Sequence, residues 1–190
     1  MEQFNINTIS NETFVAFHGT GGNEYSLLQI VGDLNKDANI RAYIGDVSEG
    51  KHRRFNLPLE NGMLNREDFD ARVDAFLKEW EMNKPEGNLT FIGYSNGANF
   101  ILGLLEKNPT IADRIILLKP TNLGFIFNEG SDARIIVTAG ARDTLSIPGE
   151  TMKLVKQLET VFPNVVFKLF DHGHELPDSE IEVVKELLNK

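Results

Sequence analysis

Apolar residues along the chain fall into short runs that alternate with segments of helical spacing. Six runs have the length and content of buried strands: residues 13–17, 39–44, 89–92, 113–118, 133–139 and 165–170. The segments between them predict helices over residues 24–34, 65–80, 98–105 and 149–160, and a last helix after Asp178. Strands and helices that alternate in this way are typical of a parallel sheet covered on both faces. The predicted fold class is α/β, with a mostly parallel sheet of about six or seven strands.

Polar residues mark where two of these helices begin. Asn65, with Asp68 three residues later, predicts one helix N-cap, and Asp178 predicts another ahead of the final helix. Residues 51–65 have no clean period and contain a proline and a glycine, so we expect a loop there. No repeat, low-complexity tract or linker divides the chain, which predicts a single domain over residues 1–190.

Composition narrows the class of protein. A chain of 190 residues with 41% hydrophobic and 25% charged residues can bury a core of ordinary size. Its net charge of −9 argues against a general nucleic-acid binder and against binding to anionic membranes. The absence of cysteine excludes disulfides, thiolate nucleophiles and zinc–thiolate sites. Since the chain shows no signal peptide and no apolar run near the roughly 20 residues that span a bilayer, we expect a cytoplasmic protein.

The candidate chemistry begins at a serine between a predicted strand and a predicted helix. Ser95 is the centre of the motif GYSNG, which directly follows the apolar run of residues 89–92. A G-x-S-x-G turn holds its serine in a strained conformation with the hydroxyl exposed at the carboxyl edge of the sheet. The amides at the start of the next helix face any negative charge that develops there. Ser95 is therefore the candidate nucleophile.

A serine nucleophile needs a base, and the base needs a carboxylate that orients it. Asp143 follows the strand of residues 133–139, and His174 follows the strand of residues 165–170, which gives the chain order Ser, Asp, His. An ordinary turn aspartate is the alternative interpretation of Asp143. His172 competes with His174 for the role of base, but its place directly at the strand end favours a packing role.

The glycine-rich loop of residues 18–24 follows the first predicted strand and is the candidate oxyanion site. Its amides can turn toward the serine, and the expected donors are the N–H groups of Thr20 and of Asn96, the residue after the nucleophile. The segment does not match a phosphate-binding P-loop, because no Gly-Lys-Ser/Thr follows the glycines. A plain tight turn is an open alternative.

A metal site is the alternative interpretation of the segment around His172 and His174. Imidazoles and carboxylates are suitable ligands, and this segment holds two of each: Asp171, His172, His174 and Glu175. A complete site would need ligands from elsewhere, and only His18 and His52 remain as imidazoles. We therefore expect no metal.

Four segments together resemble a known family. They are HGTGG at residues 18–22, GYSNGAN at residues 93–99, GARD at residues 140–143 and GHEL at residues 173–176. They resemble the phospholipase/carboxylesterase group of small α/β-hydrolases, which includes acyl-protein thioesterases and lysophospholipases, and the likeness is greatest to bacterial carboxylesterases. The resemblance implies a single-domain α/β-hydrolase without a large lid. It also implies Ser95 as nucleophile, Asp143 as acid, His174 as base, Thr20 and Asn96 as oxyanion donors, and no metal or organic cofactor.

The implied activity is hydrolysis of carboxylic esters or thioesters of small to medium acyl groups, through an acyl-enzyme. A non-catalytic module of the same fold that binds a small ligand is the alternative. Apolar residues beside the active-site loops could line an acyl pocket, although such residues more often belong to the core: Phe125, Ile126, Phe127, Leu145 and Ile147. Lys119 departs from the group, in which relatives often have a small residue or histidine, and this affects the expected polarity of the pocket. Pairing of two copies through an apolar helix face is left open.

Overall fold

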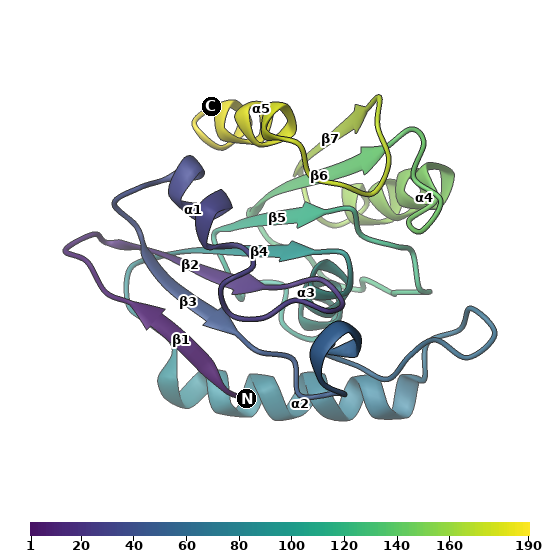
Figure 1. Cartoon of the computed structure of the whole chain (residues 1–190), viewed down its shortest axis with the longest axis horizontal. Coiled ribbons are helices and arrows are strands. Elements are labelled where there is room, and N and C mark those ends of the chain that lie inside the picture. The colour runs from purple at the N-terminus through teal and green to yellow at the C-terminus, as the bar shows by residue number, and fades with distance from the viewer.

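A seven-stranded sheet runs through the centre of the computed structural model, which describes residues 1–190 (Figure 1). The strands are β1 (Gln3–Ile6), β2 (Glu12–Phe17), β3 (Asn39–Tyr43), β4 (Asn88–Tyr94), β5 (Arg114–Leu118), β6 (Arg134–Gly140) and β7 (Asn164–Phe170). The helices are α1 (Leu28–Leu34), α2 (Arg66–Asn83), α3 (Asn96–Lys107), α4 (Pro148–Glu159) and α5 (Asp178–Leu188). The six predicted strands are all present, with ends that agree to within one or two residues.

The strand order in the sheet is β1-β3-β2-β4-β5-β6-β7. All neighbouring strands from β3 to β7 pair in parallel, and only the edge strand β1 runs antiparallel to its neighbour β3. The predicted α/β fold with a mostly parallel sheet is confirmed. The strand β1 was not predicted, because it is only four residues long and largely exposed, so it lacks the apolar run of a buried strand. In a parallel sheet the loops after the strands gather at one edge, which brings distant segments together.

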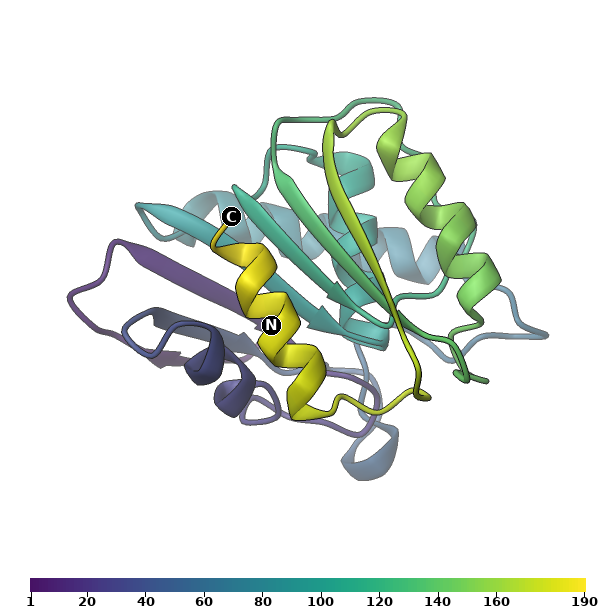
Figure 2. The ribbon, with the colours of Figure 1, turned by 90° about the horizontal axis from the view of Figure 1, so that it is seen from above.

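Different helices cover the two faces of the sheet (Figures 1 and 2). The helices α2, α3 and α4 pack on one face, whereas α1 and α5 pack on the other. Neighbouring residues of a strand point to opposite faces, so Phe91 belongs to the first core cluster and Ile92 to the second. Trp80 is buried in the first cluster and stacks on Phe76, as expected of a residue that packs its helix on the sheet.

The helix ends agree with the sequence in one case and disagree in two. Asn65 is the predicted N-cap of α2, and its Oδ1 accepts a hydrogen bond from the Asp68 amide at 3.1 Å. The prediction that Asp178 caps the last helix was wrong, because Pro177 is the N-cap and no side chain caps the helix. The first helix begins at Leu28 rather than at residue 24, since Asn23 and its neighbours form turns with side-chain hydrogen bonds to the local backbone.

The long connection between β3 and α2 is a loop, as predicted for residues 51–65. Its one regular element is a short 3-10 turn at Gly50–His52, which the isolated bridge between Val47 and Arg54 encloses. None of the helices in the structure combines the length with the apolar character needed to cross a membrane.

Candidate active site

Ser95 lies in the one-residue turn between β4 and α3. Its backbone has φ 51° and ψ −111°, a conformation that residues other than glycine rarely adopt. The Ser95 amide donates to the Leu118 carbonyl at 2.8 Å, and the Ser95 carbonyl accepts from the Asn99 amide at 3.0 Å. Hydrogen bonds to β5 and to α3 thus hold the strained turn that the G-x-S-x-G motif predicts.

The second glycine of the motif allows α3 to approach the sheet closely. A Cβ on Gly97 would lie 2.1 Å from the backbone oxygen of Phe17, which cannot move without shifting β2. We therefore expect Gly97→Ala to lower the free energy of unfolding by about 3 kcal/mol. Gly32→Ala in α1 is the control, since a Cβ there meets no atom within 4 Å, and alanine should stabilise the helix by about 0.5–1 kcal/mol. Urea unfolding measures the free energy of unfolding of both variants. Equal changes in the two variants would contradict the close packing of Gly97 against Phe17.

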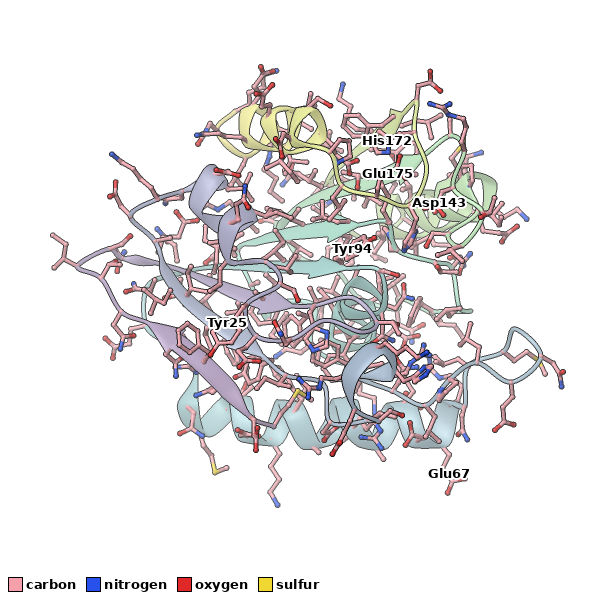
Figure 3. All side chains as sticks on the ribbon, in the orientation of Figure 1. Tyr25, Glu67, Tyr94, Asp143, His172 and Glu175 are labelled. Atoms are coloured by element: carbon pink, nitrogen blue, oxygen red, sulfur yellow. The ribbon has the colours of Figure 1, made fainter.

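Three side chains from three strand ends form a continuous hydrogen-bonded chain. Ser95 follows β4, Asp143 follows β6 and His174 follows β7. His174 Nε2 lies 2.9 Å from Ser95 Oγ, and His174 Nδ1 lies 2.7 Å from Asp143 Oδ2. Figure 3 shows the labelled Asp143, His172 and Glu175 gathered with Tyr94 at this edge of the sheet. The structure thus brings together the three residues that the sequence predicts as nucleophile, acid and base.

Asp143 is buried and uses its two carboxylate oxygens for different partners. Its Oδ1 accepts hydrogen bonds from the amides of Leu145 and Ser146, both at 2.8 Å, while Oδ2 faces His174. The Asp143 side chain therefore has two roles: one carboxylate oxygen stabilises the local turn, and the other contacts His174. The local turn fixes its orientation, which leaves one oxygen directed at the imidazole.

The two predicted oxyanion donors lie at the loop after β2 and at the start of α3. Neither the Thr20 amide nor the Asn96 amide donates a hydrogen bond to another part of the protein. The side chain of Asn96 is occupied, because its Oδ1 accepts from the Phe55 amide at 2.8 Å and its Nδ2 donates to Asn56 Oδ1 at 2.7 Å. Asn96 thus also fastens the loop of residues 51–65 to the nucleophile turn, a role that the sequence did not indicate.

His18 supports the loop that carries Thr20. It is buried, its Nδ1 lies 2.7 Å from the Gly19 carbonyl oxygen, and its Nε2 accepts a hydrogen bond from the Gly45 amide at 3.0 Å. The arrangement fixes one neutral tautomer, with the proton on Nδ1. Burial lowers the pKa of His18 from its ordinary value, and the hydrogen bond to Gly19 opposes this only in part. Both ring nitrogens have partners, so His18 is not free to bind a metal.

The lowered pKa of His18 predicts an acid-sensitive fold. Below about pH 6.5 the unfolded chain binds a proton at this residue more readily than the folded chain, so stability falls as the pH falls. We expect wild-type protein to lose more stability than His18→Gln between about pH 7 and about pH 5. Urea unfolding across this range measures the difference, with exposed His52→Gln as the control. Equal slopes for wild type and His18→Gln would show that His18 does not contribute.

Tyr94 contacts His174, the predicted base, and was not identified from the sequence. Its hydroxyl donates a hydrogen bond to the His174 carbonyl oxygen at 2.9 Å, and the two rings lie 5.3 Å apart between centroids. Burial, with a smaller contribution from the charge of Asp143, raises the pKa of Tyr94 to about 12. The hydroxyl therefore keeps its proton, and with it the hydrogen bond to His174, throughout the neutral range.

The apolar residues predicted to line an acyl pocket divide into two groups. Leu145 and Ile147 follow Asp143 and are 71% and 50% exposed, so they are open to a ligand beside the acid loop. Phe125 is 1% exposed and packs against Phe69 in the core, which leaves it no surface for a ligand. Lys119 is also fully buried and pairs with Glu180. It therefore does not change the polarity of an open pocket, contrary to the expectation from the sequence.

A cavity of about 280 Å³ adjoins the glycine-rich loop of residues 18–24. It is lined by residues that flank the candidate site, among them Thr20, Tyr94 and Leu176, and by Leu27 and Ile30 at the start of α1. No group of three or more histidine, aspartate or glutamate side chains in the structure is placed to hold a metal ion.

Comparisons with known proteins connect this geometry to hydrolases. No protein-family model matches the chain. The protein MhqD of Bacillus subtilis (strain 168), provisionally named as a hydrolase, is 27% identical over 186 residues, which cover 93% of this chain and 92% of that protein. The structure of the Bacillus cereus carboxylesterase is 26% identical with a TM-score of 0.85, and the match covers 100% of this chain and 93% of that one.

The carboxylesterase from Mesorhizobium loti has the same fold, with a TM-score of 0.84, 24% identity, and coverage of 96% of this chain and 90% of that one. The resemblance to bacterial carboxylesterases that the four motifs indicate is confirmed, and the fold is that of an α/β-hydrolase.

Proposed function

We propose that this chain is a serine hydrolase that cleaves carboxylic esters or thioesters of small to medium acyl groups through an acyl-enzyme. The observation that carries the proposal is the unbroken chain from Ser95 Oγ through His174 to Asp143, with distances of 2.9 Å and 2.7 Å. A serine next to a histidine that is itself oriented by a carboxylate is the arrangement that activates a hydroxyl for attack on an acyl carbonyl.

In the proposed reaction, Ser95 Oγ attacks the acyl carbon while His174 Nε2 takes the Ser95 hydroxyl proton. The negative charge on the carbonyl oxygen is stabilised by the amides of Thr20 and Asn96, which have no acceptor within the protein. His174 then protonates the departing alkoxide or thiolate. Water next attacks the acyl-enzyme with His174 as base, and release of the carboxylic acid restores the Ser95 hydroxyl. Asp143 holds the imidazole in the required tautomer and stabilises its charged form.

The comparisons support hydrolysis of esters in general. The Bacillus cereus relative is a carboxylesterase that matches the chain over its full length, and the Bacillus subtilis relative bears the name of a hydrolase. These similarities support an enzyme rather than a binding module. The serine mechanism and the acyl substrate belong to the proposal, because one fold hosts many chemistries.

The surroundings of the site favour a modest substrate. The cavity of about 280 Å³ beside Thr20 is close to the lower end of the roughly 300–1,000 Å³ range of small-molecule sites, and the exposed side chains of Leu145 and Ile147, just after Asp143 in the chain, offer an apolar surface. We therefore assign Leu145 and Ile147, rather than Phe125, to substrate contact.

Turnover of matched oxygen esters and thioesters tests the proposal. We expect a rapid burst of leaving group, equal to one per protein molecule, followed by slower steady release as the acyl-enzyme is hydrolysed. Acyl chains from acetyl to octanoyl, with a constant leaving group, define the preferred length. Tight binding of these esters without release of acid would instead support a non-catalytic binding module. The cytoplasmic location and the pairing of two copies stay predictions from the sequence.

A further inference from the structure

The segment that carries His174 has no regular secondary structure. It joins β7 to α5 over residues 171–177, so contacts of this base loop must fix the imidazole relative to Ser95. Tyr94 holds the His174 carbonyl, and the backbone amide of Arg142 donates to the His172 carbonyl at 3.0 Å. These hydrogen bonds hold the loop from the side of Ser95 and from the side of Asp143.

A buried cluster of charged and polar side chains lies at the root of this loop. Glu180, in the first turn of α5, and Lys119, directly after β5, are both fully buried, and Lys119 Nζ donates to Glu180 Oε2 at 2.5 Å. His172 Nε2 lies 2.9 Å from the same carboxylate oxygen, although without the alignment of a hydrogen bond. We call these three residues the Glu180 cluster. It connects the base loop to the end of β5 and to the start of α5.

The same cluster reaches the acid loop through the backbone of Lys119. Its φ of 53° is unusual for a residue with a side chain. In this conformation the Lys119 carbonyl accepts a hydrogen bond from Ser146 Oγ at 2.9 Å, and the Ser146 amide in turn donates to Asp143 Oδ1 at 2.8 Å. Lys119 thus binds Glu180 of α5, which lies beside His172 of the base loop, with its side chain, and it contacts the acid loop with its main chain.

Stability alone does not account for this cluster. Removing two charges from water is costly, and a buried ion pair can often be replaced by apolar residues of similar volume without loss of stability. The ion pair between Lys119 and Glu180 does fix a position, because its charges and its hydrogen bond define where the start of α5 lies against the end of β5. Catalysis depends strongly on such placement, since a shift of about 1 Å can lower a rate by about 10²-fold.

We propose that Lys119, His172 and Glu180 are positioning residues that hold His174 in line with Ser95 and Asp143, and so set the rate of the chemical steps. The inference rests on the proposed function, because it assigns His174 as the base. It predicts that the cluster affects kcat much more than KM, and more than it affects the stability of the fold.

The double variant Lys119→Met/Glu180→Leu separates these effects, because it replaces the ion pair by an apolar pair of similar size. We expect its urea unfolding midpoint to stay near that of wild type or above it. With 4-nitrophenyl acetate we expect kcat to fall about 10- to 100-fold while KM changes less than about threefold. The control is Arg114→Met/Glu12→Leu, which removes another ion pair at the opposite edge of the sheet, and its kcat should stay within about twofold of wild type. Unchanged kcat in the Lys119/Glu180 double variant would overturn the proposal.

A second readout does not depend on turnover. The proton on His174 Nδ1, shared with Asp143 at 2.7 Å, should give a resolved downfield proton NMR signal in wild-type protein. We expect the double variant to broaden or lose this signal, and a sharp unshifted signal would overturn the proposal. If the double variant fails to fold, Glu180→Gln, which keeps the volume and removes the charge, is measured in the same two ways. Wild-type protein without esterase activity would contradict the proposed function, while the NMR comparison would still decide whether the cluster positions His174.

Discussion

Replacing Ser95 with alanine should lower kcat/KM for ester hydrolysis at least about 10⁴-fold, because no other hydroxyl is placed to form the acyl-enzyme. Ser95 Oγ is the atom that His174 Nε2 contacts at 2.9 Å. The remaining activity should be that of the oxyanion donors and of binding alone. Alanine keeps the backbone turn between β4 and α3, so we expect circular dichroism and the unfolding midpoint to stay near those of wild type. Steady-state kinetics on purified protein measure the loss.

The matched control for this variant is Ser131→Ala. Ser131 precedes β6, and its hydroxyl donates to the Pro109 carbonyl in a loop that belongs to the opposite edge of the sheet. Its kcat/KM should stay within about twofold of wild type, since distant sites contribute independently. Near-normal turnover by Ser95→Ala would remove the serine mechanism from consideration and would require another nucleophile, such as a directly activated water.

His174→Ala should have an effect of similar size, about 10⁴-fold on kcat, because the variant removes the group that takes and returns the proton. His172→Ala should be mild by comparison, with a loss of about tenfold or less. The imidazole of His172 does not contact Ser95 but packs on Phe170 and lies beside Glu180. The two histidines differ by only two positions in the chain, so the pair is an internal control for the assignment of the base.

Rates of both histidine variants should be measured with the folded fraction determined in parallel by urea unfolding. This correction matters for His172, which contacts a buried carboxylate and thus contributes to the fold as well. The reverse pattern, a severe loss in His172→Ala and a mild loss in His174→Ala, would exchange the roles of the two histidines.

Local patterns were sufficient for the six buried strands and for the expectation that Ser95, Asp143 and His174 lie together. Buried strands appear as apolar runs, the strained turn at Ser95 has a motif of its own, and Asp143 and His174 each follow a predicted strand directly. In a parallel sheet these positions converge at one edge, so the order of elements nearly determines which loops meet. The distances of 2.9 Å and 2.7 Å agree with that reasoning.

Contacts between distant buried residues could not be predicted in the same way. Tyr94 and His174 are 80 positions apart, and Lys119 and Glu180 are 61 apart, so no window of sequence contains either pair. Lys119 was judged by what relatives have at its place and was expected to affect the pocket, whereas the structure buries it against α5. Phe125 was chosen for its closeness to an active-site loop, but hydrophobic side chains near loops are more often part of the core, and this one is.

Reaction with a fluorophosphonate probe shows directly whether Ser95 is an activated nucleophile. Such probes form a stable bond with a serine only when a base has activated its hydroxyl. We expect one adduct per molecule, located on Ser95 by peptide mapping and absent in His174→Ala. Well-folded wild-type protein that forms no adduct would contradict the serine mechanism and favour a binding module on the hydrolase fold, and an adduct on another residue would assign a different nucleophile.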